Sequence, residues 1–115
     1  MEYWLDLHMH SNSSNDGEFS PEQLMGVCST ANLKTVAVTD HNSVSGVRYA
    51  EVAANKFGMK LITGIELDCT YLGCNLHLLG YGIDSSAEIF TEIETTVHAQ
   101  EKQASRQHMK LIKDL

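Results

Sequence analysis

The sequence has few of the residues that mark secreted, fibrous or membrane-spanning proteins. Its 115 residues include one proline, one tryptophan and three cysteines. Cys28, Cys69 and Cys74 are odd in number and lack disulfide-framework spacing, which favours a reducing compartment. No run approaches the roughly 18 apolar residues of a membrane span, and the N-terminus lacks the basic start of a signal peptide. These absences favour a cytoplasmic protein with no membrane partner.

Basic residues are also scarce. Eight lysines and arginines stand against fifteen aspartates and glutamates, which gives a formal net charge of -7. This is the wrong sign for a surface that binds the backbone of duplex nucleic acid. We therefore expect no stable duplex partner, and we expect any bound phosphate to need a cation.

The remaining composition is that of an ordinary globular domain. Hydrophobic residues make up 43% and charged residues 20% of the chain, and no internal repeat or linker is visible. The length suits one domain built around one core.

Strand and helix patterns alternate along the chain. Ser20-Pro21-Glu22-Gln23 combines an N-cap serine, a proline at the first helical position and a capping-box glutamine. We predict that Leu24, Val27, Cys28 and Ala31 form the buried stripe of this helix. The predicted strands are 3–7, 35–39, 61–67 and 76–81, and the predicted helices are 20–32, 43–57 with Gly58 as its C-cap, and one or two helices beyond Ser86.

This order predicts the α/β class. Strands separated by helices of ten to fifteen residues favour right-handed βαβ units and about four parallel strands, followed by a long terminal helix. Periodicity leaves two architectures open, a small open sheet or the first half of a (β/α) barrel.

Metal-type side chains gather where the predicted strands end. Asp6, His8 and His10 alternate, so in a strand they point to one side about 6.6 Å apart. Asp40-His41 follows the second strand, and Glu66 and His77 lie on the third and fourth. The carboxyl ends of parallel strands are where sites form in such folds. Singly, Asp40 also fits an N-cap, Glu66 a solvated strand end and His77 a core histidine; together they favour a metal site.

Other candidates are weaker. Cys69 and Cys74 have no second cysteine pair to complete a tetrahedral zinc site. Cys28 fits the core. His98 and His108 lie on a polar helical segment, where we expect solvation or partial packing rather than metal binding. Neither a P-loop nor a G-x-S-x-G motif is present, so any phosphate chemistry must come from metals.

The motifs together resemble the polymerase and histidinol phosphatase (PHP) domain family over about residues 3–84. They are His8-Met9-His10-Ser11, Asp16-Gly17, Ser20-Pro21-Glu22, Thr39-Asp40-His41, Gly64-Ile65-Glu66 and His77-Leu78-Leu79-Gly80-Tyr81. The pattern is most similar to stand-alone PHP phosphoesterases that act on nucleotides or short oligonucleotides. The resemblance implies part of a distorted (β/α)7 barrel with up to three metals.

The resemblance also implies roles for individual residues. His8 and His10 would bind the first metal, and Glu66 would bridge it to a second held by His77. His41 and Asp16 would bind a third. Asp40 and His41 would form the catalytic part of the site, with Asp40 accepting hydrogen bonds that orient its neighbours.

Two positions depart from the family pattern. Asn15 stands where the family often has Asp, so we expect Asp16, which is charged, to be the better ligand, with the amide of Asn15 as a weaker alternative. Asn42 follows Thr-Asp-His where Asp is common, and we expect it only to reduce local negative charge. The histidine and carboxylate set suits two or three Zn, Mn or Fe ions.

The later histidine and the Asp-x-His pair of the PHP pattern do not occur in the 115 residues. We therefore expect an N-terminal fragment with little activity of its own, divided into 1–84, the N-terminal part of a PHP domain, and 85–115, a terminal helical segment. We expect it to form a homodimer through uncovered apolar surface. The alternatives to a phosphoesterase are a non-catalytic metal-binding or interaction module and an amidohydrolase-type barrel, whose usual metal-bridging lysine has no convincing counterpart.

Overall fold

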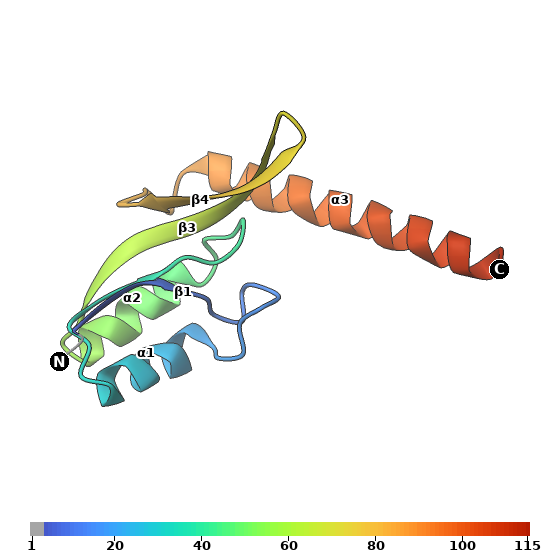
Figure 1. Cartoon of the computed structure of the whole chain (residues 1–115). Coiled ribbons are helices and arrows are strands. Elements are labelled where there is room, and N and C mark those ends of the chain that lie inside the picture. The colour runs from blue at the N-terminus through green and yellow to red at the C-terminus, as the bar shows by residue number, and fades with distance from the viewer. Residues whose placement is uncertain (1–3) are drawn as a thin grey trace.

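The computed structural model describes residues 4–115, and Tyr3, the predicted first residue of the first strand, lies outside them. The chain forms one four-stranded sheet and three helices (Figure 1). The strands are β1 (Leu5–Met9), β2 (Thr35–Val38), β3 (Lys60–Tyr71) and β4 (Cys74–Tyr81), and the helices are α1 (Pro21–Thr30), α2 (Val47–Lys56) and α3 (Glu88–Lys113). The predicted α/β class is confirmed.

The sheet order is β1-β2-β3-β4, and the first three strands are parallel. β4 pairs antiparallel with β3, so the prediction of a fourth parallel strand is wrong. Leu72 and Gly73, at φ 48° and 77°, form the two-residue connection, and positive φ at both positions is typical of a type I′ hairpin turn. A parallel pair would need a crossover of a dozen or more residues, for which this connection has no room.

α1 begins at the predicted place. The Ser20 hydroxyl accepts a hydrogen bond from the Gln23 N–H, and the Gln23 side chain accepts one from the Ser20 N–H, which completes the capping box. The predicted stripe is only half right, because Leu24 and Cys28 are buried together with Met25, whereas Val27 and Ala31 are exposed.

α2 begins at Val47, four residues later than predicted, because the segment from Ser43 to Gly46 forms a loop. Gly58, at φ 69°, follows the C-cap residue as predicted, and the Met59 N–H donates to the Ala54 carbonyl to close the helix end.

The core lies between the parallel strands and the two short helices. α1 and α2 lie side by side and cover one face of the sheet (Figure 1). Met25 of α1, Val36 and Val38 of β2, and Ala50 and Ala54 of α2 are fully or almost fully buried there. This packing fixes β1 and β2, and with them the segments that follow their carboxyl ends.

α3 is different, because none of its 26 residues is buried against the described part of the chain. It projects from the sheet and gives the molecule dimensions of 54 × 27 × 27 Å (Figure 1). Within residues 4–115, no helix combines the length and the apolar character that crossing a bilayer requires.

Candidate metal centre

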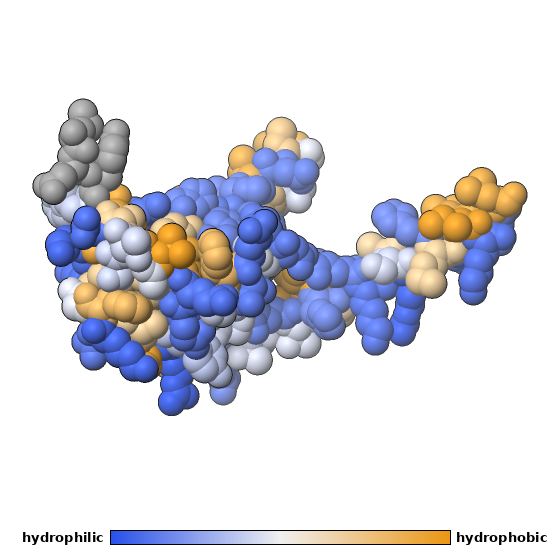
Figure 2. Space-filling view, turned by 90° about the horizontal axis from the view of Figure 1, so that it is seen from below, coloured by the Kyte–Doolittle hydropathy of each residue, from blue (hydrophilic) through white to orange (hydrophobic). Residues whose placement is uncertain are grey.

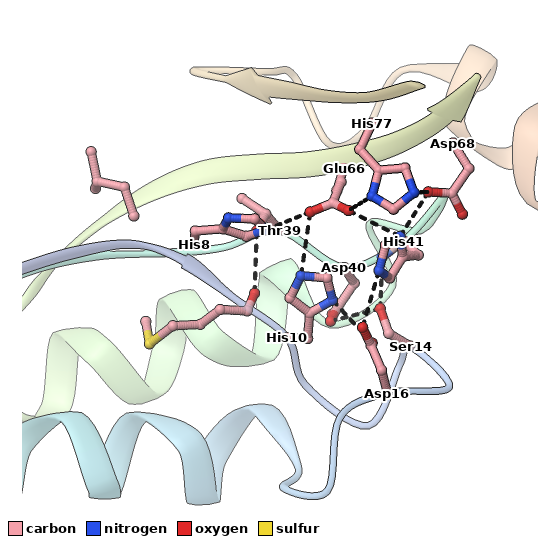
Figure 3. Close-up of polar contacts among 12 residues, drawn as sticks. His8, His10, Ser14, Asp16, Thr39, Asp40, His41, Glu66, Asp68 and His77 are labelled. Atoms are coloured by element: carbon pink, nitrogen blue, oxygen red, sulfur yellow. Dashed lines mark hydrogen bonds and ion pairs between the residues drawn. The ribbon is translucent and has the colours of Figure 1, made fainter. Parts of the chain in front are cut away.

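The predicted ligands come together around one buried carboxylate, that of Glu66 in β3 (Figure 3). Oε1 of Glu66 contacts Nε2 of His8 and lies 3.4 Å from Nε2 of His10. Oε2 lies 2.8 Å from Nδ1 of His77 and 3.3 Å from Nδ1 of His41. One carboxylate thus faces four imidazoles, and we call the surrounding group the Glu66 cluster, made of His8, His10, Asp16, His41, Glu66, Asp68 and His77.

Each member is placed by a different part of the sheet. His8 lies in β1 and His10 just beyond its end, and His41 follows β2. An isolated parallel bridge joins His41 to Glu66, which extends the β2–β3 pairing to the site. His77 reaches the cluster from β4 because the antiparallel register sets it opposite Asp68 of β3.

The cluster contains three sets of donor atoms that lie within 4.8 Å of one another. They are His8, His10 and Glu66; His10, Asp16 and His41; and His41, Glu66, Asp68 and His77. Imidazole nitrogen and carboxylate oxygen without thiolate suit Zn, Mn or Fe. The donor set therefore fits the divalent metals that the sequence predicts.

Asp16 occupies the loop position on which the sequence left a choice. Its Oδ1 lies 3.0 Å from Nδ1 of His10 and its Oδ2 lies 3.0 Å from Nε2 of His41. Burial raises the pKa of Asp16, but the charges of His10 and His41 together with hydrogen bonds to the carboxylate outweigh that effect and hold the pKa below its usual value. Asn15 is exposed and lines the same cavity as Asp16.

Asp40 is buried beneath the loop that carries Asp16. Its carboxylate accepts hydrogen bonds from the N–H and the hydroxyl of Ser11, both at 2.6 Å, and from the hydroxyl of Ser14 at 3.1 Å. Burial raises the pKa of Asp40, and the bonds from the two serines oppose that rise. The hydrogen bonds of Asp40 therefore organise the loop between His10 and Asp16, and the predicted orienting role acts through serines.

Asp68 is the cluster member that sequence reasoning missed. It lies two residues after Glu66 in β3, so both side chains point to the same face of the strand. That spacing of two was the available signal, the same one that joined His8 to His10. Asp68 Oδ1 lies 2.8 Å from Nδ1 of His41.

His41 lies between three carboxylates. Burial lowers its pKa, but the hydrogen bond to Asp68 and the charges of Asp68, Glu66 and Asp16 raise it above its usual value. Such surroundings favour a positive charge at the imidazole position, which a cation could also supply.

A cavity of about 410 Å³ opens beside the cluster. Its walls include Asp16, His41 and Asp68 from the cluster, together with Glu94 and Glu101 of α3. His98 of α3, expected to be solvated or partly packed, also lines this cavity and belongs to none of the donor sets. The many carboxylates make the cavity unfavourable for a phosphate unless cations are present.

Glu94 attaches α3 to the rest of the molecule. One of its carboxylate oxygens accepts hydrogen bonds from the Ser43 hydroxyl at 2.6 Å and from the Val44 N–H at 3.1 Å. These contacts hold the base of α3 against the loop that follows His41, and so set one wall of the cavity.

Comparison with known proteins agrees with this geometry. The family model described as the PHP domain matches residues 6–114. A 5'-3' exoribonuclease of Haemophilus influenzae is 36% identical over 81 residues, covering 70% of this chain and 29% of the relative. A 3',5'-nucleoside bisphosphate phosphatase of Chromobacterium violaceum is 31% identical over 80 residues, covering 70% of this chain and 28% of the relative.

A solved structure gives the same result for the fold. The structure is that of a predicted metal-dependent phosphoesterase from Bifidobacterium adolescentis. It superposes on this chain with a TM-score of 0.82 at 27% sequence identity. The match covers 96% of this chain and 39% of that structure. The chain thus spans under a third of the two curated relatives it matches and about two fifths of the solved one.

Proposed function

The chain belongs to the PHP domain family, and on that premise we propose that it forms the N-terminal part of a metal-dependent phosphoesterase, a hydrolase. The substrates we propose are nucleotides or other small phosphate esters, including short oligonucleotides. The observation that supports this most is the buried Glu66 carboxylate, which faces four imidazoles beside a cavity of about 410 Å³.

We assign two or three divalent ions, Zn, Mn or Fe, to the Glu66 cluster. His8, His10 and Glu66 would hold the first ion, Glu66 and His77 would hold a second, and Asp16 and His41 would hold a third. When bound, such ions polarise a phosphoryl group and lower the pKa of a water so that hydroxide exists near neutral pH. The carboxylates and imidazoles of the chain fix the spacing between the ions.

The other parts of the site support that spacing. Asp40 keeps the loop between His10 and Asp16 in place through its hydrogen bonds to Ser11 and Ser14. His41, from the predicted catalytic pair, lies on the cavity wall where a phosphoryl group would bind. The net charge of -7 supports small substrates over duplex nucleic acid. The three free cysteines support the cytoplasm as the compartment.

The second candidate is a non-catalytic metal-binding or interaction module. It is favoured by one fact, that the chain spans only 29% of the exoribonuclease it matches. We favour the phosphoesterase because the donors and the adjacent cavity together form a metal site with room for a substrate. The division into 1–84 and 85–115 stays a prediction under either function.

Metal content tests the centre. Elemental analysis of the purified chain should find bound divalent metal, and the His8→Ala/His10→Ala double variant should lose most of it, because two of few ligands are removed. Glu92→Gln, a change of an exposed residue on α3, serves as the control and should keep the metal. Equal metal content in all three proteins would contradict the assignment.

Activity distinguishes the two functions. The gene product in its natural length should hydrolyse a nucleoside bisphosphate or a short oligonucleotide in the presence of Mn²⁺ or Zn²⁺ and lose that activity with a chelator. We expect little turnover from these 115 residues alone, but their metal-loaded form should bind inorganic phosphate and the metal-free form should not. Metal binding without phosphate binding or hydrolysis would favour the non-catalytic module.

A further inference from the structure

We propose that Asp68 is the positioning residue for His41: its carboxylate accepts a hydrogen bond from Nδ1–H and so directs Nε2 toward the ion assigned to Asp16 and His41. This rests on the metal centre proposed above and gives one of its ligands a fixed tautomer. It assigns a role to two residues, Asp68 and Asn42, that the proposed ligand set does not use.

The two ring nitrogens of His41 face different partners (Figure 3). Nδ1 lies 2.8 Å from Oδ1 of Asp68 and 3.3 Å from Oε2 of Glu66, and Nε2 lies 3.0 Å from Oδ2 of Asp16. The Nε2 side leads to the donor set of His10, Asp16 and His41, because the second oxygen of Asp16 contacts His10, whereas Nδ1 faces the carboxylates of β3. A neutral imidazole binds a metal through one nitrogen and carries its proton on the other. The geometry therefore assigns Nε2 to the metal and Nδ1–H to Asp68.

Asp68 is itself held in place, by Asn42. The side-chain amide of Asn42 donates to Oδ2 of Asp68 at 3.0 Å, and its side-chain oxygen accepts from the Asp68 N–H at 2.9 Å. The pairing requires an amide at position 42, because a carboxylate there would have no proton to donate and would repel Asp68. With Oδ2 engaged by Asn42, Oδ1 is left for His41.

Asn42 has its own constraint. Its backbone lies at φ 53°, in the left-handed region that asparagine tolerates better than most residues, and its N–H donates to the Glu66 carbonyl at 2.8 Å. The turn after His41 is thereby tied to β3 at both Glu66 and Asp68. Asp68 and His41 form a carboxylate–histidine pair of the kind that orients metal-binding imidazoles, and Asn42 holds the carboxylate of that pair in place.

Asp68 also lies 3.5 Å from Nε2 of His77, a longer separation than to His41. The competing role is direct metal binding by Asp68 within the set of His41, Glu66, Asp68 and His77. In that arrangement His41 would bind through Nδ1, so the nitrogen that His41 uses separates the two roles.

The first measurement is the nitrogen chemistry of His41 in the zinc-loaded chain. Long-range ¹H–¹⁵N correlation spectra should show His41 bound to zinc through Nε2 with a proton on Nδ1. His41 bound through Nδ1 would overturn the proposal while leaving the metal centre standing. A wild-type chain that takes up no zinc would overturn the metal centre and the role of Asp68 with it.

The second measurement is zinc affinity, by competition with a chromophoric chelator. Asp68→Asn should lower the affinity for one zinc ion about 10- to 100-fold, the range found when such partners of metal-bound histidine are removed. Glu92→Gln removes the same charge from an exposed position of α3 and should leave every zinc affinity unchanged. Wild-type affinity in Asp68→Asn would overturn the proposal.

A swapped pair separates the carboxylate from the fold of the turn. Asn42→Asp/Asp68→Asn keeps an amide and a carboxylate hydrogen-bonded to each other but presents a neutral oxygen to His41. We expect a thermal unfolding midpoint near that of the wild type and the same loss of zinc affinity as in Asp68→Asn. Full recovery of zinc affinity in the swapped pair would show that the turn, and not the carboxylate, matters.

Discussion

Single residues illustrate how far the sequence predicts the site. His8 and His10, Glu66, His41 and His77 are placed by strand ends and by alternation along a strand, and both patterns are visible in the sequence. Asp68 follows the same alternation, two residues after Glu66. It was overlooked because the predicted third strand ended at Leu67, whereas β3 continues to Tyr71.

The partners of Asp40 could not be predicted from the sequence. A carboxylate after a strand was identified, but its donors, Ser11 and Ser14, lie 26 to 29 residues away in a polar loop. Nothing in a run of serines and asparagines shows which hydroxyl turns inward. That choice depends on how the loop packs over β2, a tertiary contact.

We predict that Asp40→Ala destabilises the chain by about 2 to 3 kcal/mol, because it leaves three buried donors of Ser11 and Ser14 without an acceptor. Urea denaturation followed by circular dichroism measures the free energy of unfolding. Glu51→Ala, an exposed position on α2, is the control and should change it by no more than about 0.5 kcal/mol. Equal effects of the two substitutions would contradict the inferred role of Asp40.

Among the elements, β4 departs most from prediction. The predicted strands 61–67 and 76–81 left eight residues between them, fewer than a parallel crossover requires. The spacing was therefore sufficient to predict a hairpin. The expectation of repeated βαβ units outweighed it, and the observed strands are longer than predicted and meet at a two-residue turn.

Helix starts and faces differ in how well they can be predicted. The capping box of α1 is a local interaction between Ser20 and Gln23, so the sequence is enough to place it. Which side of α1 faces the core depends on α2 and the sheet. Both Val27 and Met25 are apolar, and only the packing shows that Met25 is the buried one.

Two glycines, one in the loop before α1 and one within α1, give a matched pair of predictions. A Cβ at Gly17, in the loop before the helix, would lie 1.8 Å from the Ser11 carbonyl oxygen, so Gly17→Ala should displace that loop and destabilise the chain by more than about 1 kcal/mol. A Cβ at Gly26, within α1, would meet its nearest atom at 4.0 Å, so Gly26→Ala should stabilise by about 0.5 to 1 kcal/mol.

The midpoints of urea denaturation measure both changes. Gly17→Ala should also reduce the bound metal, because Asp16 precedes it in the chain. A stabilised Gly17→Ala, or a destabilised Gly26→Ala, would show that the contacts of these two segments differ from those described.

At the scale of the molecule, exposed apolar residues occur on the sheet and the short helices, and in addition one exposed apolar patch lies at the far end of α3. Figure 2 shows an apolar patch there, away from the rest of the molecule. Its residues are Met109, Leu111, Ile112 and Leu115, each at least 60% exposed. The sequence predicted uncovered apolar positions in this segment, and the prediction of a homodimer rests on them together with the unclosed edge and uncovered face of the sheet.

We predict that the 115-residue chain forms a dimer at micromolar concentration through this patch, which size exclusion with light scattering would detect. Ile112→Asp/Leu115→Asp should shift the population to monomer, because burying two carboxylates in an apolar contact is unfavourable. Thr95→Asp, an exposed change nearer the base of α3, is the control and should remain dimeric. A wild-type chain that is monomeric at these concentrations would contradict this prediction.

The attachment of α3 at Glu94 couples the movement of this exposed helix to the loop that it contacts. From Glu94, which accepts hydrogen bonds from Ser43 and Val44, the helix extends 19 further residues to Lys113, a length of about 28 Å. The end of α3 near Glu94 contacts the loop that follows His41 and Asn42. A small rotation of α3 about Glu94 displaces the distant end of the helix much more than the end near Glu94. Conversely, a contact that restrains the distant end of α3 also restrains the turn that positions His41.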